Sequence, residues 1–506
     1  MKSKKYNSAF LTLGSGVMTA AAQAADQTAA QKPNFVIFIA DDVAWDDIGA
    51  YGNPAVQTPN IDRLAREGMR FDKAWLTCSS CSPSRASILT GRYPHSTGCG
   101  ELHLPWPEDA VLMSTPLREA GYWAASVGKW HPWGDAGFRQ YDLVRDSNPG
   151  GCELWLEVLN GRPKDKPFFL WLAAHDAHRP YVPKTFDPPN SPDKVIVPPY
   201  LPDCPETRGD LAMYYDEISR LDSCMGKVLA ELERQGVLDN TFVLFIADNG
   251  RPFPRDKTTV YDSGVKTPFI VRYPKLIKAG SHTGSLVSSV DVAPTVLDVA
   301  GLTALPGFQG KSLTPILRDP KAVIRQYAFA EHNWHDFAGC ERGVRSDRFN
   351  YVRNWRPDLS GIPPADACKS TTWAAMTKLH AEGKLPPQQS ACFTVPRPVE
   401  ELYDTEKDPF ALHNLAGDPE YAPVLKQMRE ALDGWQKETR DEFDPQKITP
   451  DSFDRQTCKK VLDGAHPTAR PKMVYPVRAE SLKNGTTEMF IWGASGTDDF
   501  KAGDKK

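Results

Sequence analysis

The sequence predicts an α/β protein with a mostly parallel sheet sandwiched by helices, followed by a smaller α+β domain. Short unbroken apolar runs, rich in β-branched and aromatic residues, are typical of strands buried on both faces. These runs alternate with helical segments, as they do where helices join parallel strands. A change of pattern near Tyr327 indicates the second domain.

Clear local signals mark the first strand and the first two helices. Asn34–Ala40 is an unbroken apolar run and is predicted to be a buried strand. A helix is expected from Thr58 to about Gly68, with a proline at its first helical position. A second helix should have Pro83 just inside its start and should end at Gly91.

The rest of the larger domain repeats these signals. Two helices are delimited by glycine, one at about 207–235 before Gly236 and one at about 292–300 before Gly301. Further strands are predicted at Trp123–Val127, Pro167–Ala173, Thr241–Ala247 and Pro268–Arg272.

The smaller domain has a different pattern. Strand-like pieces at Tyr327–Ala330 and Phe349–Arg353 are followed by Pro-rich loops and one helix at about 421–439. We therefore divide the chain into a larger α/β domain at 25–335 and a smaller C-terminal α+β domain at 336–506.

The first 24 residues have the pattern of a cleavable signal peptide. Three lysines precede a mildly apolar stretch from Ala9 to Ala21, and Ala22-Gln23-Ala24 fits a small-x-small cleavage site. The apolar stretch is too short and too polar to span a membrane, and no later segment reaches that length. The pattern predicts export to the periplasm or the medium without a membrane anchor; a disordered N-terminus is the alternative.

Composition and charge exclude several classes of protein. The chain has 506 residues, 41% hydrophobic and 25% charged, which is typical of globular proteins and not of disordered chains or coiled coils. Its net charge of −4 becomes −7 without the three lysines of residues 1–24, which argues against nucleic acid as a partner. The ten cysteines can form disulfides in an exported chain, but the sequence leaves their pairing open.

Two predicted strands end in oxygen-bearing side chains. The run 36–40 leads into Asp41 and Asp42, and its near copy 243–247 leads into Asp248 and Asn249. In parallel sheets, sites form outside the carboxyl ends of the strands, so we expect these four side chains to meet. Their hard oxygen ligands favour Ca²⁺ over Zn²⁺. Turn chemistry at each strand end is the alternative.

The run Cys81-Ser-Pro-Ser-Arg85, continued by Ala-Ser-Ile-Leu-Thr-Gly91, resembles the signature of the type I formylglycine-dependent sulfatases. The resemblance implies an alkaline-phosphatase-like fold and a Cys81 that a sulfatase-maturing enzyme oxidises to formylglycine before folding. It also implies that Ca²⁺ is held by the modified Cys81 and the four strand-end residues Asp41, Asp42, Asp248 and Asn249. A disulfide cysteine in an ordinary capped helix is the alternative.

The resemblance assigns a set of cationic residues as well. Lys129 and His131 match the family's Lys/His pair, His178 its active-site histidine, and Lys257 its second basic position. We expect Lys129, His131, Lys257 and Arg85 to hold the sulfate, with Asp248 as the base for the attacking hydroxyl. His178 would protonate the leaving group, and His131 would take the proton of the second hydroxyl when sulfate is expelled.

Other polar residues receive weaker interpretations. Arg179 is predicted to contact the substrate, as are His332 and His335 in a polar and aromatic stretch past a strand. A solvated loop is the alternative for that stretch. Asp46 and Asp47 are interpreted as solvated loop residues. Five histidines without such a context are interpreted as structural: His95, His282, His380, His413 and His466.

The expected substrate is a sulfated carbohydrate, of the ulvan or glycosaminoglycan type. Within the family the likeness is to the heparan N-sulfatase (sulfamidase) branch and to bacterial polysaccharide sulfatases. Trp130 and Lys257 depart from the sulfamidase pattern, which has Lys and Arg there, so O-sulfate and N-sulfate both stay open. The sequence also allows a phosphatase or phosphonate hydrolase of the same superfamily, or an inactive carbohydrate-binding protein.

Overall fold

The computed structural model describes residues 31–132, 134–445 and 448–461 and two short strands, β15 (Val474–Tyr475) and β16 (Phe490–Ile491). The predicted signal peptide and His466 lie outside these residues. Within the described part, no helix is both long enough and apolar enough to cross a membrane.

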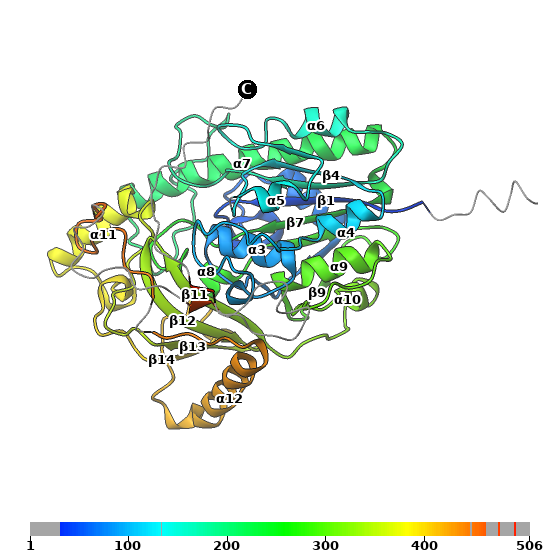
Figure 1. Cartoon of the computed structure of the whole chain (residues 1–506). Helices are drawn as coiled ribbons and strands as arrows, with labels where there is room; N and C mark the ends of the chain where they lie inside the picture. The colour runs from blue at the N-terminus through cyan, green and yellow to red at the C-terminus, as the bar shows by residue number, and fades with distance from the viewer. Residues whose placement is uncertain (1–30, 133, 446–447, 462–473, 476–489, 492–506) are drawn as a thin grey trace, which may run out of the picture.

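An eight-stranded sheet forms the centre of the larger domain (Figure 1). Five neighbouring strands, in the order β5-β4-β6-β1-β7, run parallel, which confirms the predicted mostly parallel sheet. The other side of the sheet departs from this, because β8 pairs antiparallel with both β7 and β2. The strands are β1 (Asn34–Ala40), β2 (Met69–Phe71), β4 (Trp123–Gly128), β5 (Leu143–Arg145), β6 (Phe168–Ala173), β7 (Thr241–Ala247), β8 (Phe269–Arg272) and β9 (Ser281–Thr283).

Helices cover both faces of this sheet. Phe35 and Ile37 of β1 point into one core, which includes residues of α3 and α9. Val36 and Phe38 point into the opposite core, which includes residues of α2, α6 and α7. A strand buried on both faces needs apolar residues at every position, and this explains the unbroken run in the sequence. The covering helices are α2 (Pro59–Glu67), α3 (Cys81–Thr90), α6 (Trp155–Gly161), α7 (Pro205–Arg234) and α9 (Val292–Val299).

A second, antiparallel sheet begins at Ala328. It contains β11 (Ala328–His335), β12 (Phe337–Arg345), β13 (Phe349–Asn354) and β14 (Glu400–Asp404), in that order. The long helix α12 (Ala422–Thr439) packs on it around a core that includes Tyr351 and Trp435. The stretch 331–335 lies within β11, so the interpretation of this stretch as a loop past a strand is wrong.

One disulfide, Cys152–Cys224, joins the segment before α6 to α7. It closes a loop with a sequence separation of 72 residues. The other eight cysteines have free thiols in this structure, among them Cys81.

Candidate active site

Four neighbouring parallel strands end side by side and place the site. Ala40 of β1 is in register with Ala247 of β7, and Gly128 of β4 is in register with Ala173 of β6. The residues that follow these strands therefore emerge at one edge of the sheet. Gly128 has a φ of +99°, and a Cβ there would lie 1.8 Å from the carbonyl oxygen of Ala173, so only glycine allows the close approach that precedes Lys129.

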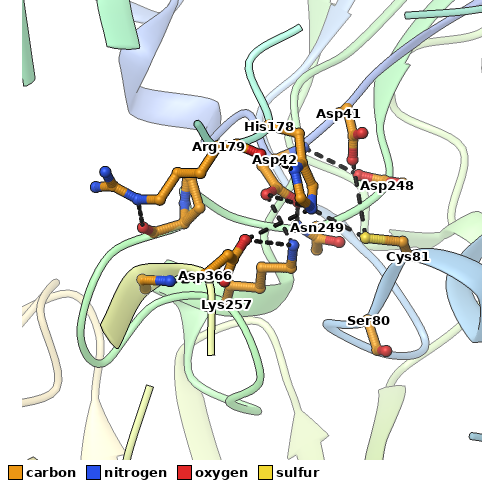
Figure 2. Close-up of polar contacts among 12 residues, drawn as sticks. Asp41, Asp42, Ser80, Cys81, His178, Arg179, Asp248, Asn249, Lys257 and Asp366 are labelled. Atoms are coloured by element: carbon orange, nitrogen blue, oxygen red, sulfur yellow. Dashed lines mark hydrogen bonds and ion pairs between the residues drawn. The ribbon is translucent and has the colours of Figure 1, made fainter. Parts of the chain in front are cut away.

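The predicted oxygen ligands meet at this edge, against the tip of α3 (Figure 2). Asp41, Asp42 and Asp248 are fully buried, and Asn249 is 1% exposed. Cys81 Sγ lies 3.8 Å from Asp41 Oδ1 and 3.9 Å from Asp42 Oδ1. Residue 81 and the two acidic strand ends thus converge, as expected from the sequence.

The chemistry of this group fits a hard divalent cation. Burial raises the pKa of Asp41 and of Asp42, so both carboxylates are costly to keep ionised without a nearby cation. Asn249 Nδ2 donates to Asp42 Oδ1 at 2.5 Å, whereas Asn249 Oδ1 is buried without a hydrogen-bond partner among the described residues. Three carboxylates and an amide oxygen are ligands that Ca²⁺ prefers.

Arg85 holds the helix tip against the strand ends. Its Nε donates to Asp248 Oδ2 at 2.7 Å and its Nη1 to the carbonyl oxygen of Lys129 at 3.2 Å. Burial opposes ionisation of Asp248, but the ion pair with Arg85 and the charge of Lys129 outweigh it and lower the pKa of Asp248. Arg85 Nη2 is buried and makes no hydrogen bond within the described residues, which leaves it available to an anion.

Two lysines complete the cationic set. Lys129 Nζ contacts Asp41 Oδ2 at 2.5 Å, and Lys257 Nζ contacts Asp42 Oδ2 at 2.8 Å. Both lysines are at least nine-tenths buried. Together with Arg85 they face four carboxylates, because Asp366 also lies 3.6 Å from Lys257 Nζ. The site therefore has one excess negative charge, and a dication bound together with a singly charged anion would leave it neutral.

The two histidines predicted for the site, His131 and His178, lie in the segments that follow β4 and β6. His178 Nδ1 is 2.6 Å from the carbonyl oxygen of Arg179, so this nitrogen carries the proton and donates. Burial and the nearby Lys257 lower the pKa of His178 to about 4. His131 is 9% exposed, and burial with the charge of Lys129 holds its pKa well below the usual range.

One charged residue of the site was not expected from the sequence. Asp366 lies between β13 and α11 (Thr371–Ala381), and its Oδ2 is 3.5 Å from His178 Nε2 and 3.6 Å from Lys257 Nζ. It follows Pro363-Pro-Ala365 and belongs to no motif. No local signal could have identified it, because only the path of the chain brings this loop to the strand ends.

Arg179 makes structural contacts in this fold, and its contact with a substrate stays a prediction. Its Nη1 and Nη2 bind the two carboxylate oxygens of Asp210 at 2.7 and 2.8 Å, and its Nε donates to the carbonyl oxygen of Pro252. The guanidinium points away from Cys81 (Figure 2) and lies between the rings of Tyr181 and Phe253.

His332 and His335 are buried, which excludes a solvated loop at these positions. Both line a cavity at the boundary between the two sheets. His335 Nδ1 is 2.7 Å from the hydroxyl of Ser80, the residue directly before Cys81. His335 therefore supports the helix tip, and contact of either histidine with a substrate stays a prediction.

Asp47 and His95 are both buried and paired, whereas the sequence predicts a solvated Asp47 and a structural His95. Asp47 is 2% exposed, not solvated, and lies 2.9 Å from the guanidinium of Arg251, which also pairs with Asp46. The sequence did not indicate this pairing because the basic partner lies far along the chain. His95 is structural as predicted: it is buried, and its Nδ1 is 2.9 Å from Glu331.

Comparisons with known proteins agree with this geometry. Residues 33–150 and 152–302 match the model of the sulfatase family, and residues 253–359 match that of the N-sulphoglucosamine sulphohydrolase C-terminal region. The chain is 32% identical over 454 residues to an ulvan-active sulfatase of Formosa agariphila, in an alignment that covers 80% of this chain and 75% of the relative. It is 30% identical over 468 residues to human N-sulphoglucosamine sulphohydrolase, with 81% of this chain and 91% of the relative covered.

A solved structure has the same fold. It was determined in complex with its substrate D-glucosamine-2-N,6-O-disulfate, and it superposes with a TM-score of 0.63 at 22% identity. The superposition covers 82% of this chain and 99% of the other. The sequence matches, which span more than half of the chain, identify the protein as a member of the sulfatase family.

Proposed function

We propose that this sulfatase releases sulfate from a sulfated carbohydrate with a formylglycine formed from Cys81 and a bound calcium ion. The observation that carries the proposal is the convergence of Cys81 Sγ with Asp41 and Asp42 within 3.9 Å, inside a ring of buried cations. This arrangement combines ligands suited to a metal ion with cationic groups suited to an anion in a single site.

Asp41, Asp42, Asp248 and Asn249 would hold the calcium ion, together with the modified residue 81. The ion would add positive charge that polarises the sulfate oxygens. The formylglycine, as a hydrate, supplies one hydroxyl to attack sulfur and a second whose ionisation expels sulfate.

The chain's own residues bind the sulfate and move protons. Arg85 and Lys129 neutralise the charge that develops on the sulfate oxygens, and the buried setting strengthens both interactions. Asp248 is an ionised acceptor for the proton of the attacking hydroxyl, although its ion pair with Arg85 makes it a weak base. His178 would protonate the leaving group from Nε2, which takes up a proton only when the negatively charged substrate is bound beside it, because Nδ1 already donates to a carbonyl oxygen. His131, neutral in its buried position, would accept a proton when sulfate departs.

The proposed substrates are sulfated oligosaccharides derived from polysaccharides. The ulvan-active sulfatase and N-sulphoglucosamine sulphohydrolase are the relatives that support this class. O-sulfate esters are our first choice, and N-sulfated glucosamine is the second, supported by the match of residues 253–359.

A two-metal phosphatase is a weaker candidate. Asp42, His178 and Asp366 form a second group of ligand atoms that could hold a cation. However, Lys257 Nζ lies 2.8 Å from Asp42 and 3.6 Å from Asp366, so an ammonium already lies beside both carboxylates and would repel a second metal ion. The complete set of cations and carboxylates also argues against an inactive binding protein.

We further propose that the chain is exported and that its partner is a sulfatase-maturing enzyme. The signal-peptide pattern of residues 1–24 supports export, and so does the disulfide Cys152–Cys224, because disulfides persist in oxidising compartments. The periplasm or the medium is the expected location.

The test is product analysis with protein co-expressed with a maturing enzyme. Released sulfate would be measured over sulfated oligosaccharides from ulvan and heparan, beside phosphate esters and phosphonates. Intact-mass analysis would report conversion of Cys81. Converted wild type should release sulfate, and Cys81→Ala should not. Full activity of Cys81→Ala would refute the proposal.

A further inference from the structure

Asp366 adds a further carboxylate to the site, on the side where His178 and Lys257 lie. Its Oδ1 accepts a hydrogen bond from the backbone N–H of Ala367 at 2.7 Å. Its Oδ2 is buried and makes no hydrogen bond among the described residues, but it faces His178 Nε2 at 3.5 Å and Lys257 Nζ at 3.6 Å; the side chain as a whole is 20% exposed. A carboxylate accepts about four hydrogen bonds, and this one accepts a single hydrogen bond from the described residues, so it has capacity for a donor on a bound substrate.

The position of Asp366 relative to Cys81 indicates what it faces. Figure 2 shows Cys81 and Asp366 on opposite sides of His178 and Lys257. Attack on sulfur from residue 81 expels the leaving group in line, on the opposite side of the sulfur. Asp366 therefore lies on the side where the sugar is attached.

A carboxylate in that position would favour some substrates over others, according to the chemical group next to the sulfated atom. An uncharged donor, O–H or N–H, can pair with Asp366. A substrate without a donor displaces water from this carboxylate and gives no hydrogen bond in return, so it binds less tightly. A second sulfate there is repelled, since like charges in a buried site raise the energy of the complex.

We propose that Asp366 is a specificity-determining residue that accepts a hydrogen bond from an uncharged donor next to the sulfate and rejects a second anionic group there. The inference rests on the proposed function. The donor has two sources, the hydroxyl on the carbon next to a sulfate ester or the bridging N–H of a sulfamate.

The test compares pairs of substrates within one enzyme. The first pair is the sulfate ester that the wild type turns over fastest and its analogue with hydrogen in place of the neighbouring hydroxyl. The second pair is N-sulfated glucosamine and its N-methyl derivative. A vicinal disulfate and 4-methylumbelliferyl sulfate complete the set. Ratios of kcat/KM cancel any general effect of the substitution on Lys257.

The variants are Asp366→Ala and Asp366→Asn, with Asp358→Asn as the matched control. Asp358 lies on the same connection and is exposed, and it pairs with Arg356 at 2.6 Å outside the site. Thermal unfolding of each variant verifies that it is folded.

In one of the two pairs, we expect the wild type to have a kcat/KM about ten- to hundredfold higher for the substrate that carries the donor. This ratio corresponds to the free energy of one hydrogen bond to a charged group. Asp366→Ala should bring that ratio to within about threefold of unity and should raise the relative rate on the vicinal disulfate. Asp358→Asn should keep the wild-type ratios. Collapse of the first ratio assigns the donor as a hydroxyl, and collapse of the second assigns it as a sulfamate N–H.

Unchanged ratios in Asp366→Ala and Asp366→Asn would overturn the inference and leave the proposed function standing. If the wild type, with Cys81 converted, hydrolyses none of the sulfates, the proposed function fails and this inference fails with it.

Discussion

Replacing Arg179 by alanine should destabilise the protein, because its guanidinium holds the loop that carries His178. Arg179 is 8% exposed and binds both oxygens of Asp210, a residue of α7. Without it, the carboxylate of Asp210 keeps the hydroxyl of Thr372 at 2.7 Å but loses its counter-charge. The anchor that holds this loop over the site would then be lost as well.

The magnitude follows from the burial of the pair. Removing one partner of a buried ion pair lowers the free energy of unfolding by about 3–5 kcal/mol. An ordered chain of about 430 residues unfolds with an entropy of about 0.9 kcal/mol/K, at about 2.1 cal/mol/K per residue. The expected decrease in Tm is therefore about 3–6 °C.

The assay is thermal unfolding of Arg179→Ala and Asp210→Ala beside Arg208→Ala. Arg208, which like Asp210 belongs to α7, makes a similar forked ion pair with Asp203. This pair lies on the surface, so its loss should shift Tm by less than about 1 °C. Both buried variants should lose activity together with stability. The reasoning is refuted if Arg179→Ala raises KM at an unchanged Tm while Asp210→Ala behaves as wild type, because that result belongs to a substrate contact.

Three further predictions concern metal, pH and the disulfide. Removing the metal with a chelator should abolish activity. Adding Ca²⁺ should raise Tm, and this increase should become smaller as the pH is lowered, because burial raises the pKa of Asp41 and protons then compete with the ion. An increase in Tm that does not depend on pH would contradict this prediction. Burial raises the pKa of Asp256 to about 8, so the folded state keeps a proton that the unfolded state releases. The stability this gives is complete below the unfolded pKa of 3.8 and is lost as the pH rises through about 8, so Asp256→Asn should lose less Tm than wild type between about pH 5 and pH 9, and parallel curves would count against it. Replacing Cys152 and Cys224 by alanine should cost about 4 kcal/mol for a loop of this length, or about 5 °C in Tm, and no change would show that the bond is absent.

The candidate metal site was predictable because its residues directly follow the ends of strands. Unbroken apolar runs identify buried strands, and parallel strands end at one edge. Two near-identical runs, each followed by a pair of oxygen ligands, therefore predict a meeting point from the sequence alone. The register of Ala40 with Ala247 agrees with that expectation.

The sugar side was less predictable, since it depends on the path of the chain. Asp366 reaches the site from a Pro-rich connection without a motif, and Arg179 turns to a partner on α7 that the sequence does not indicate. The sequence predicts that the strand ends before His332, because polar residues interrupt the apolar run, yet β11 continues through it with an irregularity between His332 and Trp334. Long-range pairing overrides local composition at these positions.

The complete burial of α3 bears on when Cys81 can be modified. All ten residues of Cys81–Thr90 are buried, and Cys81 itself is 1% exposed. A modifying enzyme has no access to this thiol once the sheet and helices have closed around it. The proposed conversion of Cys81 therefore has to precede the closing of the fold, and we expect the relative rates of conversion and folding to set the proportion of active molecules in a preparation.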